Sequence, residues 1–226
     1  MKIIVTGKNG ILSSELQKID TNLIALDSIN YNVSDKSIIQ KLTTLNPDII
    51  IHAAAITNSI EVENNPLQSI QTNIIGTANI AEYCLINNKR LVYISTDYIY
   101  PGEKGDYKET DPILPNNNYA WTKLGGECSV RLIPNHLIIR TSFGPSKFPY
   151  PEAWDNQIVS KDYVDVITPM ILKSTKSNVI GILNIGTYSK TIFEYASKRN
   201  KVHPIKKSTI NNFSLNTDKY EQLFFN

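Results

Sequence analysis

Short runs of β-branched and aliphatic residues alternate along this chain with segments whose apolar residues recur at spacings of three and four. This alternation is typical of parallel strands joined by helices that cover both faces of a sheet. The strands predicted from the runs are Lys2–Thr6, Leu23–Leu26, Ile49–Ala53, Arg90–Ser95 and Leu137–Thr141. The helices predicted between them are Ser14–Ile19, Lys36–Leu45, Leu67–Asn87 and Tyr119–Leu132. This series of strand–helix repeats predicts an α/β fold with a doubly wound parallel sheet.

The pattern changes after Ser142. Residues 143–156 are rich in proline and aromatic residues, a composition typical of loops. Beyond this stretch the sequence predicts a helix over Val164–Lys173, a strand over Gly181–Ile185 and a helix over Thr191–Lys198. The apolar residues 223–225 are expected to dock on the fold or to fray. The sequence therefore predicts a second, smaller region after the repeats.

Composition excludes several classes of protein. Lys and Arg number 23 and Asp and Glu 21, so the formal charge of +2 is too balanced for binding driven by nucleic-acid or membrane phosphates. The two cysteines, Cys84 and Cys128, fit neither a disulfide framework nor a four-ligand zinc site, and no carboxylate pair or His/Cys cluster indicates another metal. The apolar run Ile3–Val5 is too short for a signal peptide, and no run is long enough for a spanning helix. We expect a cytoplasmic protein.

Gly7 and Gly10 lie in the turn that follows the first predicted strand. Glycines at this place let backbone N–H groups at a helix N-terminus approach a pyrophosphate closely. Asp27 ends the second predicted strand, 20 residues after Gly7. A carboxylate there can accept the hydroxyls of an adenosine ribose, although a loop or capping role fits it too. Lys8 is able to attract a 2′-phosphate, so the choice between NADH and NADPH stays open.

Tyr119 and Lys123 are four residues apart in a predicted helix, so both side chains project from the same face. A neighbouring ammonium group favours the phenolate and lowers the pKa of a tyrosine. The predicted strand one repeat earlier ends at Ser95 and is followed by Thr96, at the edge where doubly wound sheets bind ligands. Hydroxyls of Thr96 and Tyr119 that converge on a carbonyl oxygen can hold and protonate it while a hydride reaches the carbon.

Together these motifs resemble the extended short-chain dehydrogenases/reductases, and within them the dTDP-4-dehydrorhamnose reductases. The matching pieces come in family order over about the first 145 residues. They are Gly7–Leu12, Leu26-Asp27, His52–Ala55 with Thr57, Thr72–Thr77, Ser95–Gly102, Glu109–Asp111, Tyr119–Lys123 with Gly126-Glu127, and Arg140–Ser142.

The resemblance implies a Rossmann fold, NADPH or NADH as the cofactor, and a nucleotide sugar as the substrate. It implies that Tyr119 donates the proton, that Lys123 lowers the pKa of Tyr119 and binds a ribose, and that Thr96 holds the substrate carbonyl. Taken singly, such residues also have structural interpretations, since Thr96 can end a strand and Asn73 can cap a helix. The implied cofactor-binding residues are Gly7, Lys8, Asn9, Gly10, Ile11, Leu12, Asp27, Asn32, Val33, Ala53, Ala54, Ala55, Asn73, Ser95, Tyr119 and Lys123. The implied substrate-binding residues are Thr57, Thr96, Asp97, Tyr98 and Phe143.

The function implied is reduction of a nucleotide-linked 4-keto-6-deoxy sugar. Bifunctional relatives that also epimerise carry a cysteine where this chain has Tyr98, which favours reduction alone. One alternative is an epimerase or dehydratase that keeps its NAD bound. Another is a non-catalytic subunit that binds the cofactor, like the regulatory subunit of methionine adenosyltransferase. The resemblance also implies a homodimer that forms through the helix of Tyr119 and Lys123.

The same resemblance divides the chain into an NAD(P)-binding Rossmann domain, residues 1–145, and a reduced substrate-binding region, residues 146–226, part of which is able to pack back on the first. Family members usually have a longer second region. We expect the shortfall between Ser142 and Tyr163, and after Lys219, where a terminal helix would otherwise stand.

Overall fold

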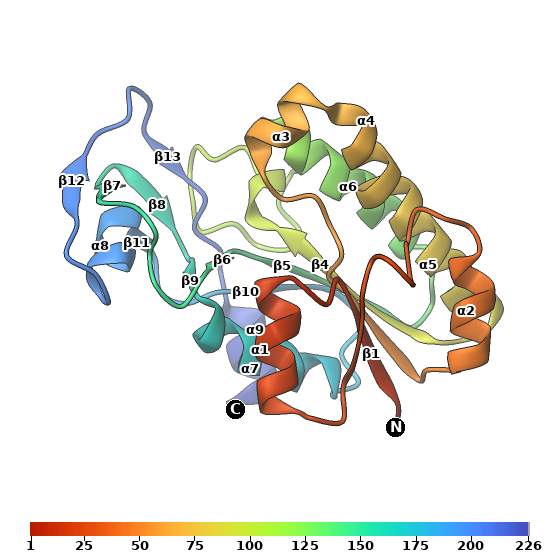
Figure 1. Ribbon diagram of the computed structural model, residues 1–226. Helices are drawn as coiled ribbons and strands as arrows, with labels where there is room; N and C mark the ends of the chain where they lie inside the picture. Colours follow the sequence, from red (N-terminus) through yellow and green to blue (C-terminus); the bar gives the residue numbers. More distant parts are fainter. Residues whose placement is uncertain (226) are drawn as a thin grey trace.

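A six-stranded parallel sheet forms the centre of the computed structural model, which describes residues 1–225. Its strand order is β10-β5-β4-β3-β1-β2, and every neighbouring pair is parallel (Figure 1). The strands are β1 (Ile3–Thr6), β2 (Ile24–Leu26), β3 (Ile49–His52), β4 (Arg90–Thr96), β5 (His136–Thr141) and β10 (Gly181–Ile185). The doubly wound sheet is confirmed, and each predicted strand forms with bounds shifted by at most one residue at either end.

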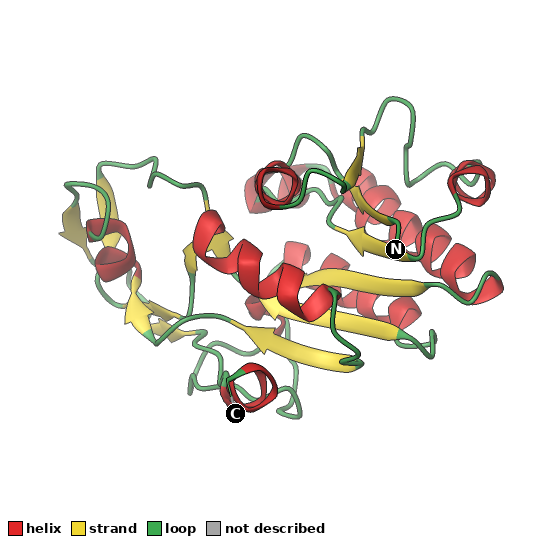
Figure 2. Ribbon diagram, turned by 90° about the horizontal axis from the view of Figure 1, so that it is seen from below, coloured by secondary structure: helices red, strands yellow, loops and turns green. Residues whose placement is uncertain are grey.

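Helices cover both faces of this sheet because successive residues of each strand point to opposite sides. Ile3 and Val5 of β1 belong to one apolar core, together with α1 (Ile11–Ile19) and α7 (Val164–Thr175). Ile4 faces the other core, which packs against α2 (Ile38–Leu45), α5 (Gly76–Ile86) and α6 (Asn118–Val130). Figure 2 shows the helices on either side of the strands.

The single helix predicted over Leu67–Asn87 is three consecutive segments. They are α4 (Pro66–Ser69), a π-helical segment η1 (Ile70–Ile75) and α5, preceded by the short helix α3 (Ser59–Asn64), which the sequence did not predict. π-helical turns are rare and frequently mark functional positions. The π-helical segment contains Asn73, whose side chain bonds Ile56 and Thr122, so the irregular turn ties two parts of the chain together.

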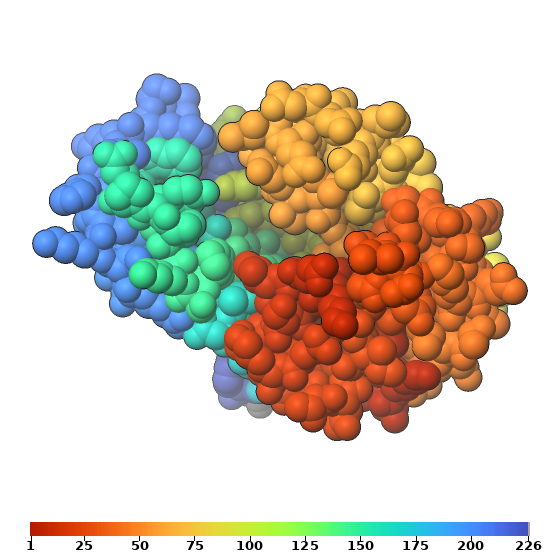
Figure 3. Space-filling view, viewed as in Figure 1, coloured from red at the N-terminus to blue at the C-terminus, as the bar shows by residue number. Residues whose placement is uncertain are grey.

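The C-terminal lobe, residues 146–163 and 186–217, consists mainly of short strands. Strands β7 (Glu152–Trp154) and β12 (His203–Ile205) pair with each other, and β8 (Gln157–Val159) lies between β11 (Lys190–Thr191) and β13 (Asn211–Asn212). The lobe also contains α8 (Ile192–Ser197), and β9 (Asp162–Tyr163) pairs with β6 (Phe143–Gly144). Figure 3 shows the lobe, in green and blue, beside the red N-terminal segment, with a hollow between them.

Two elements after residue 145 lie in the sheet layers. Strand β10 extends the large sheet beside β5, and α7 covers it on the same face as α1. Both are therefore part of the Rossmann half although they follow the boundary predicted from the sequence.

The sequence predicted that a terminal helix would be missing after Lys219. The structure contains one, α9 (Asp218–Phe224). Tyr220 of this helix is buried in the core of the α1 and α7 face, and Lys173 of α7 donates a hydrogen bond to the Phe224 carbonyl at 3.0 Å. The helix docks through its aromatic residues, which a pattern of only seven residues does not reveal.

No helix within residues 1–225 is both long and apolar enough to cross a lipid bilayer. Over the same residues, no group of His, Cys, Asp and Glu side chains is arranged to hold a metal ion.

Candidate active site

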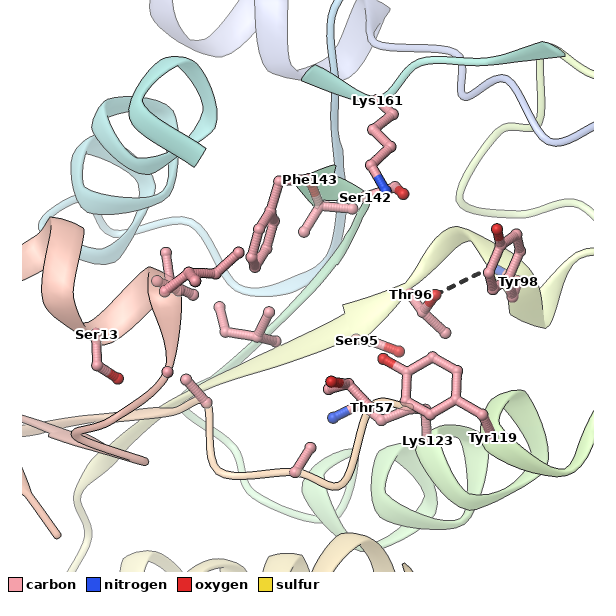
Figure 4. Close-up of a pocket in the computed structure, with 17 residues that line it drawn as sticks. Ser13, Thr57, Ser95, Thr96, Tyr98, Tyr119, Lys123, Ser142, Phe143 and Lys161 are labelled. Atoms are coloured by element: carbon pink, nitrogen blue, oxygen red, sulfur yellow. Dashed lines mark hydrogen bonds between the residues drawn. The ribbon is translucent and has the colours of Figure 1, made fainter. Parts of the chain in front are cut away.

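A cavity of about 340 Å³ opens at the carboxyl edge of the large sheet (Figure 4). Strands β3, β4 and β5 end at it, and α1, α6 and the C-terminal lobe complete its walls. It is lined by Gly10, Ile11, Leu12, Ser13, Ala53, Ala55, Thr57, Ile94, Ser95, Thr96, Tyr98, Tyr119, Lys123, Thr141, Ser142, Phe143 and Lys161. A second cavity of about 480 Å³ adjoins it and shares Gly10, Ala53 and Ala55. This edge is the usual ligand site of a doubly wound sheet.

The glycine turn after β1 borders both cavities, which share Gly10. Gly7 has φ +82°, a conformation that favours glycine, and a Cβ there would lie 3.0 Å from the Cα of Ala54. Gly10 is the N-cap of the nine-residue helix α1, and no side chain caps this helix end. The first turn of α1 lines the first cavity through Ile11, Leu12 and Ser13. Uncapped N–H groups and the helix dipole suit an anionic group such as a pyrophosphate.

A buried network of hydroxyls and an imidazole fixes the loop after β3. The Thr6 hydroxyl lies 2.7 Å from Nδ1 of His52 and accepts hydrogen bonds from the backbone N–H groups of Ala53 and Ala54. The Thr77 hydroxyl donates to a carbonyl at 2.7 Å, so it accepts from Nε2–H of His52 at 3.0 Å. Burial lowers the pKa of His52 to about 3, which keeps the ring neutral. The imidazole therefore positions the alanine loop that both cavities share.

Thr96, Tyr119 and Lys123 converge on one side of the cavity (Figure 4). Thr96 ends β4 and begins a 3-10 turn, in which its hydroxyl accepts from the N–H of Tyr98 at 3.3 Å. Tyr119 and Lys123 lie one turn apart on α6, which starts where the Asn117 side chain accepts from the N–H of Ala120 at 2.8 Å. The structure thus brings together the three residues that the sequence predicted to be catalytic.

The electrostatics of this group differ from the sequence expectation. Burial raises the pKa of Tyr119, Asp97 and Tyr98 raise it further, and only the Thr96 hydroxyl lowers it. Burial also lowers the pKa of Lys123 to about 7, and its ammonium group lies 4.1 Å from the centre of the Tyr93 ring. Burial thus dominates the pKa of Tyr119, and Lys123 is not among the groups that shift it, so the pKa-lowering role of Lys123 stays a prediction.

Asp97 is buried behind Thr96 and does not line either cavity. One carboxylate oxygen accepts from the Thr96 hydroxyl at 3.2 Å, and the other has no hydrogen-bond partner among residues 1–225. Burial raises the pKa of Asp97 to about 6, an effect that the nearby Lys161 opposes. The remaining residues predicted to bind substrate all line the first cavity: Thr57, Thr96, Tyr98 and Phe143.

Nine of the sixteen residues predicted for the cofactor line the second cavity, five others line the first cavity, and two, Asp27 and Asn73, line neither. Asp27 accepts hydrogen bonds from the N–H groups of Ile29 and Asn30 and so closes a local turn, the structural interpretation left open by the sequence. Asn73 is fully buried and bonds the backbone of Ile56 and the Thr122 hydroxyl, so it supports the site from behind. The lining residues are Gly7, Lys8, Asn9, Gly10, Ser28, Tyr31, Asn32, Val33, Ser34, Ala53, Ala54, Ala55, Ile56, Gln68, Gln71 and Thr72.

Several lining residues were missed by the sequence analysis. Lys161 and Ser142 reach the catalytic side of the cavity, and Ser28 and Tyr31 line the second cavity. The signal for Ser142 was its place after β5, where parallel strands present side chains to a ligand. No comparable signal marked Lys161, which lies outside the segments that resemble the family.

Comparisons with known proteins agree with this architecture. A family model described as the RmlD substrate binding domain matches residues 1–166. A dTDP-4-dehydrorhamnose reductase from Aggregatibacter actinomycetemcomitans is 29% identical over 201 residues, which are 84% of this chain and 68% of that protein. One from Salmonella typhimurium is 36% identical over 154 residues, 63% of this chain and 51% of that protein. This chain therefore spans about two thirds of the first relative and about half of the second.

Solved structures resemble nearly the whole chain. A crystal structure of dTDP-4-dehydrorhamnose reductase from Bacillus anthracis in complex with NADP has a TM-score of 0.87 and 26% identity, covering 99% of this chain and 92% of that one. A UDP-glucose 4-epimerase from Thermus thermophilus in complex with NAD has a TM-score of 0.83 at 18% identity and covers 100% and 94% of the two chains, which shows the fold alone. Because the family model matches well over half of this chain, the chain belongs to the RmlD substrate binding domain family.

Proposed function

We propose that this protein is an NAD(P)H-dependent reductase of a nucleotide-linked 4-keto-6-deoxy sugar, with dTDP-4-dehydrorhamnose as the substrate that its relatives' names indicate. One observation carries the proposal. Thr96, Tyr119 and Lys123 line a cavity whose opposite end is the uncapped N-terminus of α1. A site for a reducible carbonyl group would therefore lie next to a site for an anionic dinucleotide.

The residues fit a nicotinamide dinucleotide. The backbone of the glycine turn and of α1 would hold the pyrophosphate, and the alanine loop after β3 would lie beneath it. The second cavity would take the adenosine half through Asn32 and Val33, which line it. When bound, the reduced nicotinamide supplies a hydride to the sugar C4 carbon.

The side chains of this chain supply the proton and the orientation. The hydroxyls of Thr96 and Tyr119 hold the carbonyl oxygen, and Tyr119 donates its proton as the carbon–oxygen double bond becomes a single bond. Because burial raises the pKa of Tyr119, the phenol is protonated before the reaction. An anionic cofactor beside Lys123 favours its charged form, and the ammonium then stabilises the phenolate that remains.

Reduction without epimerisation fits the cavity better than the alternatives. Removal of a proton beside the carbonyl would need an additional acid/base group. Tyr98 stands where bifunctional relatives have a cysteine, and burial raises its pKa. Cys84 is buried and Cys128 exposed, and neither lines the catalytic cavity. No observation favours a non-catalytic subunit.

The cofactor is NADPH or NADH, and the contacts of Asp27 favour NADPH. Its carboxylate accepts from the Asn30 backbone at 2.8 Å and also from the Asn30 amide, whereas Lys8 and Ser28 line the second cavity. A cation and a hydroxyl at that place would bind a 2′-phosphate, which a free carboxylate would repel.

A homodimer and a cytoplasmic location remain predictions. The outer side of α6 and its neighbour exposes Trp121, Leu67 and Ile70, which supports association through this face. If it occurs, Trp121→Glu should convert a dimer into a monomer in light scattering; a wild-type monomer would contradict the dimer.

The proposed activity is tested by mixing wild-type protein, NADPH and dTDP-4-dehydrorhamnose and following NADPH absorbance. We expect one NADPH oxidised for each sugar reduced. Sugar conversion without net NADPH oxidation would instead identify an epimerase or dehydratase. No oxidation with dTDP- or UDP-linked 4-keto-6-deoxy sugars would contradict the proposal.

A further inference from the structure

Lys161 enters the catalytic cavity from the C-terminal lobe. Its side chain lies on the wall opposite the helix that carries Tyr119 and Lys123 (Figure 4). Burial lowers the pKa of Lys161, and Asp97 is the one charged group that counteracts this effect. Within residues 1–225 no hydrogen bond or ion pair engages its ammonium group; its nearest aromatic partner, the Tyr195 ring, is centred 5.8 Å away. A cation without a partner in a cavity wall is costly unless a ligand supplies the partner.

The lobe holds the backbone of this lysine from several sides. Lys190 donates a hydrogen bond to the Lys161 carbonyl at 2.9 Å, and the Ser160 carbonyl accepts from the N–H of Thr187 at 2.9 Å. The next residue, Asp162, is buried and pairs with Lys198 at 2.8 Å. A Cβ at Gly186 would lie 2.8 Å from the Cβ of Ser160, so the two loops cross in close contact. Contacts within the lobe therefore fix the direction of the Lys161 side chain.

The stem of Lys161 is equally constrained. A Cβ at Gly144 would lie 3.3 Å from its Cε atom, which places the side chain directly against the backbone after β5. Beside the ammonium group, Ser142 lines the cavity, and the Thr141 hydroxyl is buried without a hydrogen-bond partner among the described residues. A cation and hydroxyl donors therefore share this end of the cavity.

We propose that Lys161 binds the diphosphate of the sugar nucleotide. Among the residues lining this cavity, only Lys123 and Lys161 carry cationic side chains, and Lys123 lies one helical turn from Tyr119. Lys161 is thus the cation that the cavity offers to a second anionic ligand. An ammonium group is a common partner for phosphate oxygens, and the charge-assisted hydrogen bond is among the stronger ones. This inference rests on the proposed function for the identity of the ligand and on the lobe for its position.

A competing explanation is that Lys161 serves only as the counter-charge of Asp97. The groups that face Asp97 are Thr96 and Tyr98 from its own segment, Tyr119 from α6, Ser142 from the end of β5 and Lys161 from the lobe. In that case, replacing Lys161 would change the affinity for the nucleotide only while Asp97 is present. A diphosphate ligand predicts an effect of Lys161 that persists in the Asp97→Asn background.

The test is calorimetric titration of the NADP⁺-saturated protein with dTDP and with UDP, which need no turnover. We expect Lys161→Met to weaken the better-binding nucleotide roughly 10- to 100-fold, and Lys161→Arg to restore most of the affinity. Lys147→Met is the matched control, because Lys147 is an exposed lysine of the lobe that lines neither site cavity, and it should leave the affinity unchanged. NADP⁺ affinity and the melting temperature of Lys161→Met should match those of the wild type.

The outcomes separate the two proposals. Equal dTDP affinity in wild type and Lys161→Met would overturn the diphosphate role while leaving the reductase proposal standing. An effect that vanishes in Asp97→Asn would overturn it in favour of the counter-charge. Nucleotide binding that depends on Lys161 in a protein that oxidises no NADPH would support the binding role and contradict the reductase. A wild-type protein that binds neither dTDP nor UDP would contradict both.

Discussion

The Rossmann half and the C-terminal lobe hold their functional residues by different means. In the Rossmann half, apolar strands that are buried on both faces end at the cavity. These strands and α6 hold Thr96, Tyr119 and Lys123 in the cavity wall. The lobe has strands of two or three residues, held by ion pairs around Asp162 and by aromatic contacts such as Tyr163 with Tyr195, whose rings are 4.5 Å apart. Under the proposed function, the sheet positions the chemistry and the lobe positions the substrate.

The largest effect is expected from Tyr119→Phe. Loss of the proton donor should reduce kcat by about 10²- to 10⁴-fold, the usual contribution of general acid catalysis. Because the ring remains, NADPH affinity should stay within about twofold of the wild type. Steady-state kinetics and NADPH fluorescence titration measure the two quantities. Residual kcat above a tenth of the wild type would show that another group donates the proton.

A stability comparison sharpens the contrast between the two regions. Glu127 pairs with Arg140 at 2.9 Å, and both side chains are 1% exposed. Glu127→Ala should lower the free energy of unfolding by about 3–5 kcal/mol, because it leaves a buried guanidinium group unpaired. Arg199 of the lobe pairs with Asp165 of α7 at 2.8 Å, but the two side chains are 34% and 38% exposed. Arg199→Ala should lower the free energy of unfolding by only about 1 kcal/mol. Urea denaturation measures both, and equal losses would contradict the distinction.

The buried lysine of the site predicts a pH-dependent difference in stability. The pKa of Lys123 is about 7 in the folded protein against an ordinary value of 10.5, so between these values the unfolded chain binds more protons. The contribution of Lys123 therefore makes the free energy of unfolding of the wild type rise with pH across this window. Lys123→Met should be more stable than wild type at pH 7, by up to about 4 kcal/mol, and lose this advantage toward about pH 10.

Denaturation of both proteins from pH 6 to 10 checks this sign. The tyrosines whose pKa values are raised titrate in both proteins and cancel in the difference. Lys147→Met, which removes an exposed lysine, should show no such pH-dependent difference. A stability advantage of Lys123→Met that grows with pH would contradict the lowered pKa of Lys123.

A smaller effect is expected from Lys8→Met in the cofactor half. If Lys8 contacts the 2′-phosphate, its loss should raise the KM for NADPH by about threefold to tenfold and leave the KM for NADH unchanged. Equal changes for the two cofactors would show that Lys8 contacts a group they share, such as the pyrophosphate.

The sequence predicted the elements whose signals are local. Apolar periodicity located each strand of the Rossmann half, and the spacing of Tyr119 and Lys123 placed both side chains on one helix face. Residues whose roles depend on distant parts of the chain escaped prediction. Lys161 reaches the site only because a lobe built from strands of two or three residues folds back beside β5.

Burial also opposes an effect that a motif predicted. Proximity of Lys123 to Tyr119 implies a lowered phenol pKa, but in the folded protein both groups are desolvated and the phenol pKa is raised. Asp27 likewise has the position of a ribose ligand along the chain, yet its carboxylate is engaged by the backbone two and three residues later. Spacing fixes which side chains are neighbours, whereas solvent exposure and local turns decide what charge and contacts they have.

The most direct test of the reductase proposal is a single-turnover reaction of the wild-type protein with NADPH deuterated at the transferred position of C4 and dTDP-4-dehydrorhamnose. Mass spectrometry of the sugar nucleotide should find one deuterium at sugar C4 and one NADP⁺ formed for each product. Product without deuterium, or deuterium retained in the cofactor while the sugar is transformed, would contradict hydride transfer from the cofactor as the function of this site.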